Sequence, residues 1–304
     1  MSSSREKGGK TRVATYHALE SVFSARWFLL LRDSLIILAI IVLLLAPILY
    51  LGKYAITDWW EIDFNVFNHP VIHSTRWEAI KNSLILSFKL ALYATLLDVA
   101  LGIPVAIALQ KDIPGRRILD TLVNVPLATP TSALGFATLI FWGTRAGIGG
   151  ILGLQTGLFS LDELVGGNIF GFPPLLLLAH VSFTFPYIVR SVSAVLEGID
   201  VTYSEAAQTL GAKSFTRFRT VTLPLMAPGV FAGAILAFTR SLGETGASII
   251  VAGVFVTAPI LVVEWKAEVL IASAAFLSMI LVVLACISIF VFRKLMGAAF
   301  ARAL

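Results

Sequence analysis

Residues 205–224 read EAAQTLGAKSFTRFRTVTLP and describe two short helices separated by a glycine. Thr202 and Glu205 stand three positions apart, the spacing of a capping box that starts a helix. Small and apolar side chains then recur at spacings of three and four, which places them on one face: Tyr203, Ala206, Ala207 and Leu210. Gly211 is typical of the left-handed residue that ends a helix. The first helix therefore presents a flat face to which another surface can come close.

The second half of this stretch predicts a helix that begins at Ser214 and places Phe215 and Phe218 together. Pro224 suits the first turn of the helix that follows, because that position needs no backbone N–H. We therefore expect two short helices that are rigidly attached to a long apolar helix.

The composition around this loop is that of a membrane protein. Hydrophobic residues make up 58% of the 304 residues and charged residues 13%, whereas soluble domains carry about 25% charged residues. A bilayer-spanning helix needs about 20 mostly apolar residues. Six segments qualify, and they predict an all-α, polytopic fold with six transmembrane helices: 34–51, 82–109, 120–142, 173–194, 226–251 and 269–292.

The distribution of basic residues sets the predicted orientation. With six spans, both termini lie on one side, and sixteen lysines and arginines fall in the tails and loops of that side, including the 205–224 loop. The opposite loops hold five: Lys53, Arg76, Lys81, Arg145 and Lys266. Basic loop residues are retained in the cytoplasm. We therefore expect both termini in the cytoplasm and a location in the cell membrane. The same rule explains the net charge of +5 without nucleic-acid binding.

The chain divides into four predicted segments. Residues 1–32 form a cytoplasmic basic tail with an interfacial helix, and residues 33–79 hold the first transmembrane helix and an outer loop. Residues 80–292 form a core that holds the other five apolar segments, and residues 293–304 a cytoplasmic tail. The N-terminal stretch lacks the pattern of a cleavable signal, so the first helix is expected to remain.

The spacing E-A-A-x3-G-x9-[I/V]-x-L-P in residues 205–224 resembles the cytoplasmic loop of permease subunits of binding-protein-dependent ABC importers, with Val221 in place of the usual isoleucine. The resemblance implies a type I ABC importer permease core in which a coupling loop, residues 197–224, docks on an ATPase. The docking residues that it implies are Glu205, Ala206, Ala207, Leu210, Gly211, Val221, Leu223 and Pro224.

Further resemblance points to a substrate class. Residues 125–130 with Gly135 and Phe136, and residues 239–247, resemble sulfate, molybdate and tungstate permeases, and 243–245 also resembles phosphate permeases. A small oxyanion is the implied solute, and another small solute of the same importer class is the alternative. The implied translocation path includes Pro126, Pro130, Gly135, Arg240 and Glu244.

The residues themselves support a more modest interpretation of that path. Pro126 and Pro130 remove backbone donors within an apolar helix, which bends it and frees carbonyl groups. Arg240 and Glu244 stand four apart on the fifth apolar segment, where charges are costly unless they face protein or water. They either line the path or form a structural ion pair. Asp98 is a further candidate partner for Arg240.

Nucleotide chemistry is expected on a partner. Gly9-Lys10-Thr11 imitates the end of a phosphate-binding loop, but Ser4 stands where its first glycine belongs. We therefore expect no enzyme activity and no cofactor in this chain, and ATP–Mg on ABC ATPase subunits. The other expected partners are an extracytoplasmic solute-binding protein, a second permease copy or sister permease, and the lipid bilayer.

Other classes of site and protein fit less well. His69 and His73 are interrupted by Pro70 and have no further ligands nearby in sequence, so no metal site is expected. His180 is interpreted as a hydrogen-bonded packing residue. An intramembrane enzyme lacks a suitable serine site or a second membrane aspartate, and a channel leaves the 205–224 loop unexplained.

Overall fold

The computed structural model describes residues 26–68, 73–153 and 171–301. These residues are helical and contain no β-strand. The chain separates into two compact units, Met1–Thr57 and Asp58–Leu304. The predicted interfacial helix lies largely outside the described residues, and the described part of the chain is already helical at Arg26.

The described part of the first unit is one long apolar helix. It comprises α2 (Arg26–Ile40), the π-helical turn η1 (Ile41–Leu45) and α3 (Ala46–Thr57). The segment Leu29–Thr57 is long enough to span a membrane, and none of the residues in its most apolar stretch is buried. This helix extends six residues beyond the predicted end at residue 51.

At two places within the described residues, a π-helical turn ends two positions before a proline. In η1 the N–H of Ala46 bonds to the carbonyl of Ile41, five residues back, and Pro47 follows. In η5 (Phe218–Thr222) the N–H of Leu223 bonds to the carbonyl of Phe218, and Pro224 follows. Proline lacks an N–H and crowds the carbonyl four residues before it. The wider turn relieves that crowding, and the helix continues in both cases.

The second unit opens with α4 (Trp59–Ile62) and η2 (Asp63–Phe67), where an outer loop was predicted. The long α5 (His73–Leu109) follows, then α6 (Arg116–Ala128), α7 (Thr131–Gly143) and the short α8 (Ile148–Ile151). After α9 (Pro174–Glu197) come α10 (Val201–Thr209) and α11 (Ser214–Arg217). The remaining helices are α12 (Leu223–Leu242), α13 (Ser248–Val251), α14 (Ala258–Ala267) and α15 (Ile271–Ala301).

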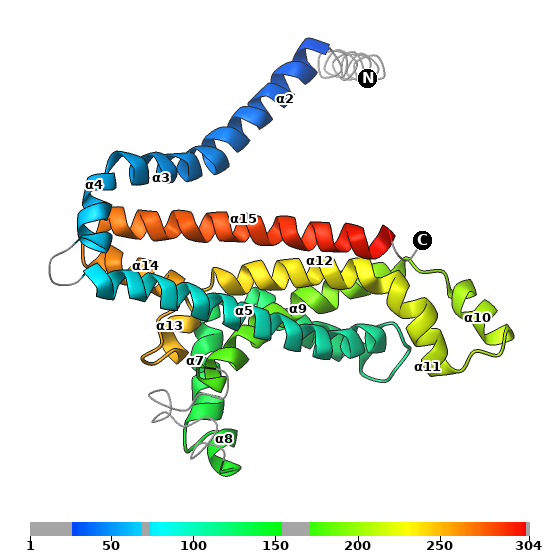
Figure 1. Ribbon diagram of the computed structural model, residues 1–304. Helices are drawn as coiled ribbons and strands as arrows, with labels where there is room; N and C mark the ends of the chain where they lie inside the picture. The colour runs from blue at the N-terminus through cyan, green and yellow to red at the C-terminus, as the bar shows by residue number, and fades with distance from the viewer. Residues whose placement is uncertain (1–25, 69–72, 154–170, 302–304) are drawn as a thin grey trace, which may run out of the picture. The chain divides into compact units, whose positions relative to one another are not determined.

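Helix α9 is the centre of this unit. It packs against α5 and α12, and also contacts α6 and α7 (Figure 1). In the most apolar stretch of α9, 61% of the residues are buried, whereas only 17% are buried in the most apolar stretch of α15. Helices α10 and α11 project beyond the bundle at the end where α9 finishes and α12 begins (Figure 1).

Two of the six predicted spans are interrupted. The predicted helix 120–142 is broken at Thr129–Pro130, and the two parts are bent by 114°. The predicted helix 226–251 ends at Leu242, and α13 begins only at Ser248. The described residues therefore hold five apolar helices of spanning length, or six spans if the bent pair counts as one.

Glycines in α12 bring its backbone against α9. A Cβ atom added at Gly233 would lie 2.9 Å from Ile188 Cα, and one at Gly229 would lie 2.6 Å from the carbonyl oxygen of Ser191. Small residues at such crossings let helices pack closely where lipid gives no hydrophobic drive.

Gly233→Ala is expected to destabilise the protein by about 1–3 kcal/mol, because the new methyl group meets backbone that cannot rotate away. Thermal unfolding of the purified protein in detergent measures the effect. Gly297→Ala in α15 is the matched control, since a Cβ there meets nothing within 4 Å. Equal unfolding temperatures for the two variants would contradict the close crossing.

Candidate functional site

The two helix breaks of the second unit lie against each other. A Cβ added at Gly246 would come within 2.7 Å of Thr131 Oγ1 and 3.3 Å of the Ser132 nitrogen, in the first turn of α7. A Cβ at Gly135 would lie 2.8 Å from Ala247 Cα. The backbone of residues 243–247 therefore packs directly on the start of α7. We call residues 129–135 and 240–248 together the break site.

Glu244 accepts two hydrogen bonds from residues within its own helix break. Its Oε1 accepts a hydrogen bond from the N–H of Ala247 at 3.0 Å, and its carbonyl accepts one from the Ser248 hydroxyl at 3.2 Å. Its Oε2 lies 2.5 Å from Nη1 of Arg240. The side chain of Glu244 is 3% exposed, whereas that of Arg240 is 36% exposed. The predicted pair exists, but Glu244 lies beyond the end of α12 and not on its face.

The guanidinium of Arg240 has a second contact. It lies over the ring of Phe183 on α9, 5.1 Å from the ring centre, a cation–π arrangement. Asp98 does not pair with Arg240, so that expectation was wrong. Asp98 is fully buried, and its carboxylate lies beside Thr184 of α9 and not beside Arg240.

His180 on α9 spans the break in the fifth apolar segment. Its Nδ1 lies 2.7 Å from the hydroxyl of Ser241, before the break, and its Nε2 lies 2.8 Å from that of Ser248, after it. Because the Ser248 hydroxyl donates to the carbonyl of Glu244, Nε2 is assigned as the donor to Ser248 and Nδ1 as the acceptor from Ser241. The interpretation of His180 as a hydrogen-bonded packing residue is confirmed.

The break in the third apolar segment follows from Thr129 and Pro130. Both residues have extended backbone, with ψ of 134°, and α7 starts directly after them. The Thr129 hydroxyl donates to the carbonyl of Val125 at 2.8 Å, which satisfies one acceptor that the break leaves free. Pro126 lies inside α6. Gly135 is buried against Ala247, so it permits close packing of the two breaks.

Helix α10 forms the first half of the coupling loop, and it is capped by Asp200. The Asp200 carboxylate accepts hydrogen bonds from the Thr202 N–H at 2.9 Å and from the Thr202 hydroxyl, which hold the pKa of Asp200 below its usual value. The predicted start at Thr202 with Glu205 as its capping partner was therefore wrong, because Asp200 offers an oxygen two residues earlier.

The end of α10 matches the prediction. Gly211 has φ of +83°, the Ala212 N–H bonds to the carbonyl of Ala207, and the Gly211 N–H bonds to that of Gln208. This is the Schellman arrangement. The Gln208 amide oxygen also accepts from Arg217 Nη1 at 2.8 Å, which fixes α10 to α11.

The coupling loop exposes large apolar side chains. Leu210 is 88% exposed, Phe215 73% and Tyr203 58%. Phe218 instead packs against the core, so the predicted pairing of the two phenylalanines in one environment was wrong. Because α11, η5 and α12 are continuous, Val221, Leu223 and Pro224 belong to the base of a long helix.

Sequence reasoning missed several partners in the break site. No role as a hydrogen-bond or packing partner was predicted for Ser241, Gly246, Ser248 or Thr131, although glycines on both sides of Glu244 in an apolar segment were a signal for a break.

His180→Phe keeps an aromatic ring but removes both serine contacts, and we expect a loss of about 1–3 kcal/mol of stability, because buried hydroxyls lose a partner. Thermal unfolding in detergent measures it. Ser278→Ala is the control, since that hydroxyl bonds only within its own helix. If His180→Phe unfolds at the same temperature as this control, the histidine does not hold the break together.

Comparison with known proteins gives consistent results. The profile of the family described as "Binding-protein-dependent transport system inner membrane component" matches residues 98–302. The molybdenum transport system permease protein ModB of Escherichia coli (strain K12) is 36% identical over 180 residues, 59% of this chain and 73% of that protein. The sulfate transport system permease protein CysT of Salmonella typhimurium is 32% identical over 242 residues, 79% of this chain and 76% of that protein.

Solved structures share the fold. A chain of the MetNI methionine ABC transporter in inward-facing conformations has a TM-score of 0.56 at 18% identity and covers 72% of this chain and 95% of that chain. A chain of a bacterial ABC transporter involved in the import of alginate has a TM-score of 0.61 at 15% identity, over 92% and 99%. The family is one of transport permeases, not of enzymes. This chain thus belongs to the binding-protein-dependent transport system inner membrane components, the permease subunits of type I ABC importers.

Proposed function

We propose that this permease forms the translocation path for a small tetrahedral oxyanion, with molybdate and sulfate as the first candidates and tungstate and phosphate next. The observation that carries this substrate class is the identity of 36% and 32% to permeases named for molybdenum and sulfate. The path would form with a second copy of the chain or a sister permease.

The break site is proposed as the part of the path that meets the solute. Discontinuous helices place free backbone groups and half-helix ends at the middle of a transporter, where solutes bind. Arg240 remains partly exposed while Glu244 neutralises it, which suits brief contact with an anion, since a pathway must also release its solute. Pro126, Pro130 and Gly135 shape this region.

The coupling loop is proposed to dock on an ABC ATPase subunit, which holds ATP–Mg. The exposed Tyr203, Leu210 and Phe215 supply an apolar docking face, and the bond between Gln208 and Arg217 makes α10 and α11 move as one body. When the ATPases close, this body would turn the base of α12, and the core would change from inward-open to outward-open. An extracytoplasmic binding protein would deliver the solute, with both termini of the chain in the cytoplasm of a cell-membrane complex.

Purification of the tagged chain from its native membrane tests the assembly. We expect an ATPase subunit and a solute-binding protein to purify with it. Each oxyanion is then titrated into that binding protein, and uptake of the labelled anion is measured in proteoliposomes with ATP. Uptake of a cation or an organic solute, with no oxyanion uptake, would overturn the substrate class.

Gly211→Val is expected to reduce ATP-driven uptake strongly while the protein still inserts and folds. A side chain at this left-handed position costs about 1–2 kcal/mol, and a branched one disturbs the turn between α10 and α11. Nothing lies within 4 Å of the added Cβ, so the effect is confined to backbone conformation. Gly211→Asn is the control, since asparagine tolerates this conformation. Normal uptake by Gly211→Val would contradict the coupling role.

A further inference from the structure

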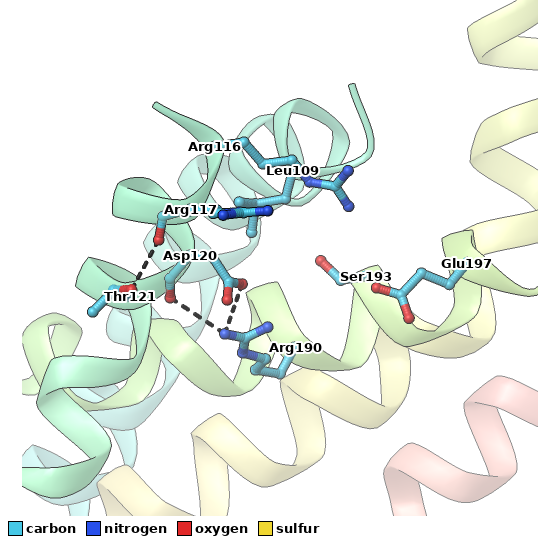
Figure 2. A pocket seen from close by; sticks show the side chains of 8 residues that line it. All are labelled: Leu109, Arg116, Arg117, Asp120, Thr121, Arg190, Ser193 and Glu197. Atoms are coloured by element: carbon cyan, nitrogen blue, oxygen red, sulfur yellow. Dashed lines mark hydrogen bonds and ion pairs between the residues drawn. The ribbon is translucent and has the colours of Figure 1, made fainter. Parts of the chain in front are cut away.

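A polar cavity lies where α6 faces the last turns of α9 (Figure 2). It has a volume of about 510 Å³ and is lined by Leu109, Arg116, Arg117, Asp120, Thr121, Arg190, Ser193 and Glu197. Glu197 is the last residue of α9, three residues before the Asp200 cap of the coupling loop. The cavity is therefore at the coupling-loop end of the core, away from the break site. We call it the basic cavity.

Arg190 is a fixed part of the wall of the basic cavity. Its Nη2 lies 2.8 Å from Asp120 Oδ1 and 3.3 Å from the Asp120 carbonyl, and its Nε donates to Asn124 Oδ1 at 2.7 Å. These contacts connect α9 to α6 and neutralise Asp120 (Figure 2). The Arg190–Asp120 pair therefore adds little net charge to the cavity.

Two further arginines carry positive charge that no close ion pair neutralises. Arg116 has only a long ion pair to Asp112, 3.5 Å between exposed groups, which contributes little in water. The guanidinium of Arg117 has no hydrogen bond or ion pair within the described ranges. Figure 2 shows it extending from α6 into the space opposite Ser193.

Ser193 supplies a second and independent sign of a ligand. The residue is 3% exposed, lines the cavity, and its hydroxyl has no hydrogen-bond partner among the described residues. A buried hydroxyl without a partner carries an unfavourable desolvation energy. A ligand oxygen in the basic cavity would accept this hydrogen bond.

The start of α6 favours negative charge next to the basic cavity. Gly115, with φ of +84°, precedes α6, and no side chain caps its first N–H groups. Uncapped N–H groups and the helix dipole attract anions. A second cavity of about 660 Å³ at this helix start shares Arg116 and Arg117 with the basic cavity.

Glu197 acts in the opposite direction. It stands at the end of the cavity beyond Ser193 (Figure 2), and no ion pair of its carboxylate is formed among the described residues. A carboxylate near an anion weakens its binding. The basic cavity therefore combines donors for an oxyanion with one group that limits how tightly the anion is held.

We propose that the basic cavity binds a tetrahedral oxyanion, with Arg117 and Arg116 as charge partners, the Ser193 hydroxyl as a donor, and Glu197 as the group that keeps binding weak. Two sources carry this chemistry: the transported oxyanion as it leaves the path, and the phosphate of an anionic lipid. The first source rests on the proposed function, whereas the second does not.

Binding is measured on the complete permease–ATPase complex in detergent, without the binding protein. The probes are labelled sulfate, molybdate and a short-chain phosphatidylglycerol, each in equilibrium dialysis.

Arg117→Gln and Ser193→Ala are each expected to weaken binding by roughly tenfold, since each removes a hydrogen bond to a charged group. Glu197→Gln is expected to tighten binding several-fold, because it removes a like charge. Arg145→Gln, an exposed arginine between α7 and α8, is the matched control and should change nothing.

The pattern of outcomes identifies the source. Sulfate or molybdate binding that follows these shifts supports a site for the exiting anion, and lipid binding alone that follows them supports a headgroup site. No binding of any probe, or binding that Arg117→Gln and Glu197→Gln leave unchanged, overturns the proposal. Proteoliposome uptake with the binding protein tests the proposed function separately. Uptake can fail for every oxyanion while the lipid still binds, and it can succeed while the cavity binds nothing.

Discussion

A backbone polar group within a bilayer has no water to bond to, so each interruption of a helix must find its partners inside the protein. This constraint governs the second unit. The third apolar segment is interrupted at residues 129–130 and the fifth at residues 243–247. Each break finds hydrogen-bond partners locally: Glu244 accepts from the N–H of Ala247, and the Thr129 hydroxyl donates to a carbonyl of α6. Glycines then allow the two backbones to pack against each other.

Helix α9 makes this arrangement possible because it contacts both interrupted segments. It contributes His180 to the serines on either side of the second break, and Phe183 to the guanidinium of Arg240. Near its other end, Arg190 fixes it to α6. One buried helix therefore connects the break site with the basic cavity and leads directly into the coupling loop. A displacement of α10 and α11 would reach the break site through α9 and through the continuous helix that contains α12.

At two other prolines, a π-helical turn keeps the helix continuous. Pro47 and Pro224 each follow a π-helical turn, which accommodates the missing N–H and lets the helix run on. At Pro130 no such turn is present, the preceding Thr129 is extended, and the direction changes by 114°. Other prolines lie inside α-helices that continue without a π-helical turn: Pro104, Pro126, Pro186 and Pro228. The sharp bend at Pro130 therefore goes with the extended backbone of Thr129 and not with proline alone.

The sequence by itself determined the all-helical membrane class, the apolar segments, and the two short helices with the stop at Gly211, because these depend on composition and on contacts within a few residues. The importer family also followed from it, through the spacing of residues 205–224. Only the tertiary structure decided the meeting of the two breaks, the isolation of Asp98 from Arg240, and the grouping of Arg117, Arg190 and Ser193 around one cavity. These depend on side chains far apart in the chain, and on which competing hydrogen bond the packed backbone allows. Periodicity along a single helix contains no information about contacts between distant side chains, or about which of two competing hydrogen bonds forms.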